Sequence, residues 1–251
     1  MQKTQKTTQL AANGQEIGRD MPALAELLNQ AEPLQLAKSI GDADVYRASW
    51  KEREVLVKTY RYRPWLVRLL LGKRCLTNEY SALDYIHSHG LARVPRPLGW
   101  LDEVSYAIEY VPNVGHVENP EHHPDNIPPR AFFEELIAML SKLHEHGIAH
   151  GDLRRANILV GKDGHPWLID FATSINLNTS HLLLRKLFFR VFRVMDLHAL
   201  GKIIQMSYPE LVQGEIRECL EHPPWYVRLG HFYRHGFYRN VFRRKGHHIG
   251  D

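Results

Sequence analysis

The chain has 251 residues, with 32 Lys and Arg against 28 Asp and Glu and a hydrophobic content of 44%. Such a composition excludes a chain that is disordered throughout, and the length suits one large domain or two small lobes. No apolar stretch reaches the roughly 20 uncharged residues of a membrane-spanning helix. The N-terminus has no apolar core of a secretory signal, so we expect a cytoplasmic protein. Cys75 and Cys219 have no CxxC spacing, which argues against a disulfide framework or a zinc site.

Charge is distributed unevenly along the chain. Residues 55–78, here called the basic block, contain no acid and carry Lys58, Arg61, Arg63, Arg68, Lys73 and Arg74. Residues 102–135 are acidic and have Arg130 as their only basic residue. The tail from 224 to 250 is again basic and is interleaved with aromatic residues. The two basic segments favour an anionic partner.

The first half of the chain is expected to form a small β-rich unit. After about twenty polar residues, the pattern predicts a short helix over 22–28 and three strands over 34–40, 44–50 and 55–60. Turn residues at 41–42 and 51–52 separate the strands, so a meander is the simplest arrangement. Helical spacing then predicts a helix over 76–88, followed by strands over 94–100 and 104–111.

The second half is expected to be mainly helical. Pro129 opens the clearest helix of the chain, whose apolar face runs to Leu143 and which Gly147 closes. Two short apolar strands follow at 158–160 and 167–169, joined by a turn over 161–164. A basic helix over 182–206 completes the pattern, with Leu184, Leu187 and Phe188 on one face and Lys186, Arg190 and Arg193 on another. Its apolar face is expected to cover a core.

One motif decides the fold class. The sequence HGDLRRANILV at 150–160 lies between the strong helix and the hairpin, and Asp170 and Phe171 follow the hairpin. These residues resemble the H-x-D-x-x-x-x-N and D-F-G motifs of the protein-kinase-like superfamily. The resemblance implies an α+β, two-lobed fold with an N-terminal antiparallel β lobe and a C-terminal mainly helical lobe. The lobes would occupy 34–111 and 112–223, between a partly flexible extension at 1–33 and the basic aromatic tail at 224–251.

The resemblance implies a kinase that uses ATP and Mg²⁺. Asp152 would accept the proton of the acceptor hydroxyl, and Arg154 would meet the oxygens of the migrating phosphoryl group. Asn157 and Asp170 supply oxygen ligands of the kind that Mg²⁺ prefers. Since a histidine in this motif typically packs against the following phenylalanine, His150 is expected to support Phe171 rather than to transfer protons.

Upstream residues extend the resemblance. Lys58 ends a predicted strand and would hold the α- and β-phosphates, with Glu79 as its ion-pair partner. Glu109 and Val111 lie where the lobes would join, and their backbone groups would meet the adenine. Gly41 is the one glycine kept from the G-x-G-x-x-G loop of the superfamily, because Ala43 and Tyr46 stand at the other two positions.

Differences from the motifs of regulated protein kinases indicate which subgroup of the superfamily this sequence resembles. Gly151 stands where those kinases carry an arginine, and no A-P-E sequence follows Ala172, so we do not expect control by a phosphorylated activation segment. The pattern is that of a compact, atypical kinase. It is most similar to bacterial lipopolysaccharide-core sugar kinases, the Kdo and heptose group, and to Rio-like proteins. Residues 58–72, 78–83 and 185–200 carry this similarity.

The favoured acceptor is therefore a sugar of the lipopolysaccharide core, an anionic glycolipid. It would be reached at the cytoplasmic face of the inner membrane, where the basic segments would make peripheral contact. Three alternatives stay open: an atypical Rio-like Ser/Thr protein kinase, a small-molecule phosphotransferase of the aminoglycoside or choline kinase kind, and a pseudokinase scaffold. No groove-reading motif accompanies the basic tail, so nucleic acid is not an expected partner.

Overall fold

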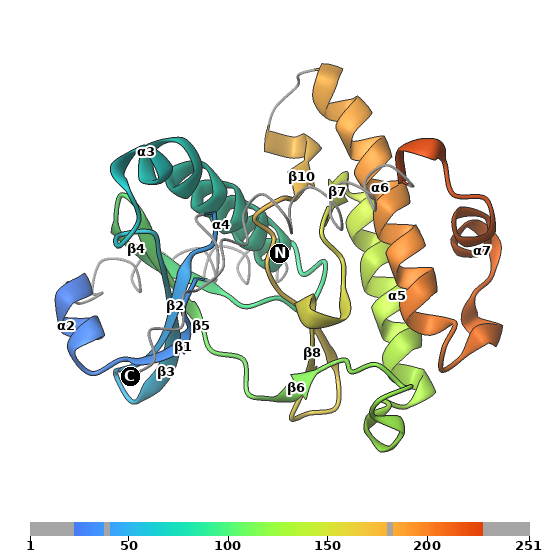
Figure 1. The fold of residues 1–251 in the computed structure, drawn as a ribbon, viewed down its shortest axis with the longest axis horizontal. Coiled ribbons are helices and arrows are strands. Elements are labelled where there is room, and N and C mark those ends of the chain that lie inside the picture. The colour runs from blue at the N-terminus through green and yellow to red at the C-terminus, as the bar shows by residue number, and fades with distance from the viewer. Residues whose placement is uncertain (1–22, 38–40, 180–182, 228–251) are drawn as a thin grey trace, which may run out of the picture.

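A computed structural model describes residues 23–37, 41–179 and 183–227 of the protein. They form two lobes, a β-rich N-terminal lobe and a mainly helical C-terminal lobe (Figure 1). The expected α+β kinase-like fold is therefore confirmed. Residues 1–22, most of the tail and part of the segment between the first two strands lie outside the described ranges. None of the described helices is long and apolar enough to cross a membrane.

A five-stranded antiparallel sheet forms the N-terminal lobe. Its order is β1-β2-β3-β5-β4, with β1 at Glu32–Gln35, β2 at Asp44–Trp50, β3 at Arg53–Thr59, β4 at Pro97–Asp102 and β5 at Ser105–Glu109. In β3, Val55, Val57 and Thr59 are buried while the residues between them are more exposed, which is the alternation of a strand packed on a core. The structure ends the first strand at Gln35, so the expected strand over 34–40 is shorter and begins earlier.

A short helix covers one face of this sheet. Helix α2 (Leu24–Asn29) buries Leu24 and Leu27 against Ala48, Val55 and Val57 of the sheet. Figure 1 shows α2 on the opposite side of the strands from α4. Residues 24–33, which the sequence assigns to an extension, thus pack as part of the lobe.

The other face of the sheet carries a helix that is longer than the expected one over 76–88. It runs as α3 (Trp65–Val67), a π-helical turn η1 (Arg68–Gly72) and α4 (Lys73–Ser88), and the backbone stays helical at both junctions. We call residues 65–88 the long helix. Its start was missed because residues 65–71 show no single buried apolar face. Pro64 precedes the first turn, a position that suits proline because no N–H is needed there.

Three helices dominate the C-terminal lobe: α5 (Arg130–Glu145), α6 (Leu183–Ile204) and α7 (Gly214–Glu221). A three-stranded sheet of order β6-β8-β9 lies at the lobe boundary, with β6 at Asn113–His116, β8 at Ile158–Gly161 and β9 at Pro166–Leu168. A second, two-stranded sheet pairs β7 (Ile148–Ala149) with β10 (Ile175–Asn176). The expected helices at 129–143 and 182–206 and the hairpin at 158–169 match these elements closely.

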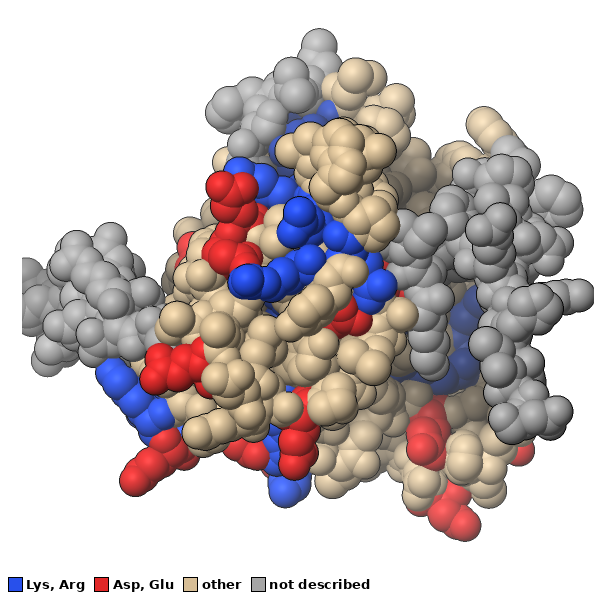
Figure 2. Space-filling model, turned by 60° about the vertical axis from the view of Figure 1, so that its left-hand side comes forward, with Lys and Arg blue, Asp and Glu red and all other residues tan. Residues whose placement is uncertain are grey.

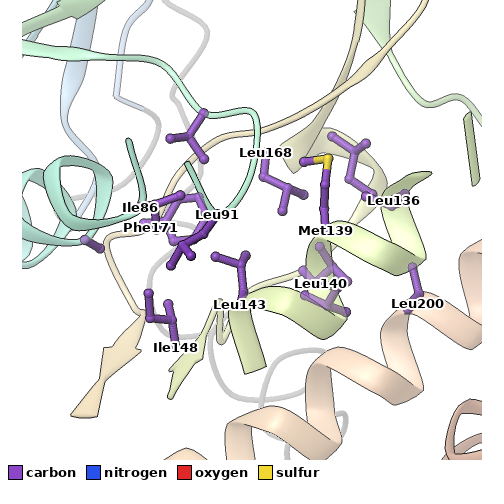
Figure 3. Packing of buried hydrophobic residues seen from close by; sticks show 14 of the residues in the cluster. Ile86, Leu91, Leu136, Met139, Leu140, Leu143, Ile148, Leu168, Phe171 and Leu200 are labelled. Atoms are coloured by element: carbon purple, nitrogen blue, oxygen red, sulfur yellow. The ribbon is translucent and has the colours of Figure 1, made fainter. Parts of the chain in front are cut away.

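A single apolar core runs through both lobes. Ile86 of the long helix belongs to the same buried cluster as Leu143, Ile148 and Phe171 of the C-terminal lobe. Figure 3 shows these side chains gathered where α4 approaches α5 and β7. The core therefore fixes the position of one lobe against the other.

Candidate active site

The loop between β7 and β8 holds the motif residues, and a buried carboxylate anchors its backbone. Asp196 of α6 is 1% exposed. Its Oδ2 accepts a hydrogen bond from the N–H of His150 at 2.7 Å, and its Oδ1 accepts one from the N–H of Gly151 at 2.9 Å. His144 of α5 also contacts Oδ2, at 3.1 Å. Several hydrogen bonds of this kind are needed to offset the cost of burying a charge, and they hold the loop in place.

His150 packs as the sequence predicts. Its ring centroid lies 4.5 Å from that of Phe171, and its Nε2 contacts the carbonyl oxygen of Ile169 at 3.0 Å. His150 and Phe171 are both fully buried. His150 thus links the loop that carries Asp152 to the segment that carries Asp170, and it acts as a structural support.

Asp152, Arg154 and Asn157 lie together on this loop. The Nδ2 of Asn157 donates to the carbonyl oxygen of Asp152 at 2.8 Å and to its Oδ2 at 3.3 Å. Arg154 pairs with the same Oδ2 at 3.3 Å, while its side chain stays 55% exposed. The carboxylate is therefore oriented from two sides, and the guanidinium remains accessible to an anionic substrate.

Asp170 lies two residues after the end of β9, the second strand of the hairpin, and has an unusual backbone. Its φ is +66°, in the left-handed region that few non-glycine residues adopt. The N–H of Ile169, its neighbour, donates to the carbonyl oxygen of Asn157 at 3.1 Å, which ties the two loops together. Such local strain is typical of functional positions, where surrounding contacts hold it.

These two loops fit a magnesium ion. The amide nitrogen of Asn157 donates to Asp152. The Oδ1 of Asn157 is therefore the atom left for a cation. The carboxylate of Asp170 would supply the second oxygen, and Mg²⁺ typically completes its coordination with phosphate oxygens and water. An amide and a carboxylate on adjacent, mutually bonded loops are thus a suitable donor set.

Lys58 and Glu79 form the ion pair expected from the sequence. The Nζ of Lys58 lies 2.5 Å from Oε1 of Glu79, and the two side chains are 15% and 3% exposed. Burial by itself lowers the pKa of Lys58, but the carboxylates of Glu79 and Asp170 outweigh it and leave the pKa above its usual value. Lys58 is thus a stable cation between Glu79 of the long helix and the segment that carries Asp170.

Asn78, one residue before Glu79, makes contacts that the sequence did not reveal. Its Nδ2 reaches the carbonyl oxygens of Ala172 at 3.0 Å and Ser174 at 2.9 Å, and lies 3.4 Å from that of Phe171. These partners are more than 90 positions away in sequence. Local patterns carry no signal for a contact of this range, so only the folded chain shows that Asn78 joins the long helix to the segment after Asp170.

A tyrosine connects the first loop to the long helix. The hydroxyl of Tyr60 donates to the carbonyl oxygen of Gly41 at 2.8 Å. Its ring lies against Gly72, where a Cβ atom would come within 2.9 Å of it. Gly41 is therefore tied through Tyr60 to the long helix that carries Glu79, although residues 38–40 of the loop lie outside the described ranges.

The segment that joins the lobes leaves a backbone donor for a ligand. Glu109 ends β5, and its N–H already donates to the carbonyl oxygen of Arg96 at 2.9 Å. The carbonyl oxygen of Val111 accepts from the side chain of Asn113 at 2.7 Å. Within the described residues, the N–H of Val111 has no acceptor. This donor is available to a ring nitrogen of adenine, as the sequence proposed for Val111.

The structure thus brings the candidate phosphate-binding, catalytic and magnesium-binding residues together where the two lobes meet. Lys58 and Glu79 come from the N-terminal lobe, and Asp152, Asn157 and Asp170 face them from the C-terminal lobe. The carboxylate of Asp170, in the C-terminal lobe, helps to raise the pKa of Lys58 in the N-terminal lobe. Asn78, Asp196 and Tyr60 support the arrangement and had no assigned role at the level of sequence.

Comparison with known proteins agrees with this arrangement. A sequence model of the RIO domain matches residues 67–190, just under half of the chain. The chain is 28% identical over 123 residues to the probable serine/threonine protein kinase IREH1 of Arabidopsis thaliana, an alignment that covers 49% of this chain and 8% of the relative. It is 27% identical over 111 residues to the human serine/threonine-protein kinase greatwall, covering 44% of this chain and 10% of that protein.

The chain spans a tenth or less of the length of these relatives. Together with the fold, the matches support the protein-kinase-like superfamily, a Rio-like atypical kinase and the use of ATP and Mg²⁺. They carry no indication of a lipopolysaccharide sugar as acceptor.

Proposed function

We propose that this chain is a Rio-like kinase that transfers the γ-phosphoryl group of ATP to a serine or threonine hydroxyl of a protein. The observation that carries the proposal is the Lys58–Glu79 ion pair at 2.5 Å, set opposite Asp152, Asn157 and Asp170. A pseudokinase has no need to keep all five. Their presence together where the two lobes meet supports turnover rather than nucleotide binding alone.

Each residue has a definite task in the transfer. Lys58 is a cation held toward the cleft and would bind the α- and β-phosphates, while the N–H of Val111 would bind the adenine. Asp152 would orient the acceptor hydroxyl and accept its proton as the new P–O bond forms and the bond to ADP breaks. Arg154 would bind the equatorial oxygens of the migrating group. Asn157 and Asp170 would hold Mg²⁺, which neutralises charge on the phosphates.

The relatives favour a protein as the acceptor, since those that match are named serine/threonine protein kinases. A lipopolysaccharide-core sugar is the second candidate. One observation favours it: the exposed start of the long helix combines apolar and cationic side chains, which suits an enzyme that reaches a lipid-linked substrate. The two acceptors differ in where the label from ATP would appear.

The test is transfer of label from γ-labelled ATP, with Mg²⁺ and a bacterial extract, into protein, glycolipid and soluble pools. The control is Asp152→Asn. Because general-base catalysis and orientation are lost, this variant should transfer label about 10²- to 10⁴-fold more slowly. ATP binding, measured by titration calorimetry, should change little because Asp152 is not assigned to the nucleotide.

The distribution of label separates the candidates. Label in protein that depends on Asp152 supports the proposal, and label in glycolipid replaces the protein acceptor with the sugar. Label confined to small molecules would make the chain a small-molecule phosphotransferase. Equal, negligible transfer by both forms, with ATP bound, would identify a pseudokinase and overturn the proposal.

A further inference from the structure

The start of the long helix presents an apolar face to solvent. Trp65, Leu66, Leu69 and Leu70 are 64%, 50%, 62% and 64% exposed. Positions at this spacing lie on one side of a helix. Val67 between them packs instead against the main core. We call these four exposed residues the apolar tip; it belongs to neither of the two buried clusters.

Cations border the apolar tip. Lys73 and Arg74 follow it within one turn of the same helix and are exposed, and Arg68 lies inside it. In the part of the chain that the structure describes, no carboxylate pairs with Lys73 or Arg74. Figure 2 shows this side of the molecule: uncharged side chains project near the top, with a group of Lys and Arg side chains beside and below them and some acidic side chains at the border.

A second exposed apolar stripe lies on α6. Leu184, Leu187 and Phe188 are 67%, 58% and 49% exposed, at the spacing of one helix face, with Lys186 and Arg190 exposed beside them. The sequence predicted that this face would cover a core, and the structure corrects that prediction. In Figure 1 the first turns of α6 and the start of the long helix both lie at the upper edge of the molecule.

Large exposed side chains of this kind are costly in water. Removing such side chains from water is favourable, and contiguous apolar patches on soluble proteins typically mark an interaction site. The charges around the patch indicate which kind of partner binds there. Lysine is depleted in the centre of protein–protein interfaces, whereas tryptophan, leucine and cations together on one short helix are typical of segments that lie in the headgroup region of an anionic bilayer.

We propose that the apolar tip and its flanking cations, Arg68, Lys73 and Arg74, dock this protein on the surface of an anionic lipid bilayer. Trp65, Leu66, Leu69 and Leu70 enter the boundary between headgroups and acyl chains, and the cations contact the lipid phosphates. The proposal concerns binding to lipid, so it stands whether the phosphate acceptor is a protein or a sugar.

The test is flotation of the full chain with vesicles, without ATP. One set is made of phosphatidylcholine and the other of an equal mixture of phosphatidylcholine and phosphatidylglycerol. The chain should float with the anionic vesicles and much less with the neutral ones. Leu69→Gln/Leu70→Gln should weaken binding at least about tenfold, and Lys73→Gln/Arg74→Gln about fivefold for each charge removed. Added salt should weaken binding by the wild-type chain.

Matched controls use exposed residues elsewhere. Leu34→Gln/Leu36→Gln removes two leucines that are 57% and 55% exposed at the sheet edge, and Arg53→Gln/Lys162→Gln removes two exposed cations. Both should float like the wild type. Titration calorimetry with ATP should give the same affinity for the tip variants as for the wild type, which shows that they are folded.

The proposal is overturned if the wild type fails to float with anionic vesicles, or if tip and control variants lose binding equally. A dimer or a complex with another protein that depends on Leu69 and Leu70, in a chain that ignores vesicles, would assign the surface to a protein partner instead. Failure of phosphoryl transfer alone leaves vesicle binding unaffected, so the two proposals are tested separately.

Discussion

Gly151 illustrates how the surroundings of a single residue determine its identity. From sequence, this glycine marks only the loss of an arginine that regulated kinases carry. In the structure its φ is +80°, and a Cβ atom would lie 2.7 Å from Cδ2 of Phe192 and 2.9 Å from the carbonyl oxygen of Thr173. Both the backbone conformation and the contact with α6 require glycine.

Replacing this glycine should therefore destabilise the catalytic loop. We expect Gly151→Ala to lower the free energy of unfolding by about 1 to 3 kcal/mol more than Gly164→Ala does. Gly164 is the matched control because it has the same φ of +80° but nothing within 4 Å of its Cβ position. Denaturant titration measures the difference. Equal losses in the two variants would show that the contact with Phe192 is unimportant.

At the scale of the elements, Asn78 couples the long helix to the segment that follows Asp170. Replacing Asn78 with alanine removes the donor that binds the carbonyl oxygens of residues 171, 172 and 174. Replacing it with aspartate places a negative charge against the same oxygens. Phosphoryl transfer should therefore fall about tenfold in Asn78→Ala, and further in Asn78→Asp. ATP affinity should change less, because Lys58 and Val111 remain in place.

Steady-state kinetics with a labelled acceptor measures this effect. Thr77→Ala is the control, since Thr77 is the exposed neighbour on the same helix. It should keep the wild-type rate. If Asn78→Asp transferred phosphate as fast as the wild type, the hydrogen bonds of Asn78 would not position the metal-binding segment.

The sequence predicted well those elements whose pattern is local. Strand β2 has the predicted bounds, and the helix that starts after Pro129 and the hairpin at 158–169 nearly so, because each has a clear period and turn residues at its ends. The start of the long helix was missed because its leucines face solvent, so no buried face appears at helical spacing. Periodicity identifies a helix only where one side of it packs on a core.

The residues of the candidate site also fall into two groups, those that a local motif predicts and those that act through long-range contacts. The roles proposed for Asp152 and Asp170 come from a motif, and the structure connects their loops through the hydrogen bond between Ile169 and Asn157. The support by Asp196 and Asn78 depends on hydrogen bonds across 45 positions or more. Such contacts exist only once the lobes have packed, and a single sequence holds no local signal for them.

At the scale of the whole molecule, the two lobes share one apolar core and should unfold together. Ile86 lies in the long helix but belongs to the cluster that includes Leu143 and Phe171. We expect Ile86→Ala to lower the free energy of unfolding by about 2 to 5 kcal/mol. Hydrogen exchange should show the same loss of protection in β5 as in α5, because Tyr106 and Ile108 of β5 belong to the shared core.

The control for this prediction is Leu27→Ala, in the separate cluster between α2 and the sheet. It should reduce protection mainly in α2, β2 and β3. Loss of protection in β5 alone for Ile86→Ala, with α5 unchanged, would mean that the lobes fold as independent units.

The long helix connects the exposed apolar tip mechanically to the Lys58–Glu79 ion pair. Trp65 at its exposed end and Glu79 near its middle belong to one helical segment, so they lie about 21 Å apart along the axis. A force that tilts the outer end also moves the glutamate relative to Lys58. The free energy of a contact at the outer end would therefore be linked to that of the ion pair, and by reciprocity a nucleotide bound at Lys58, as proposed, would alter the strength of that contact.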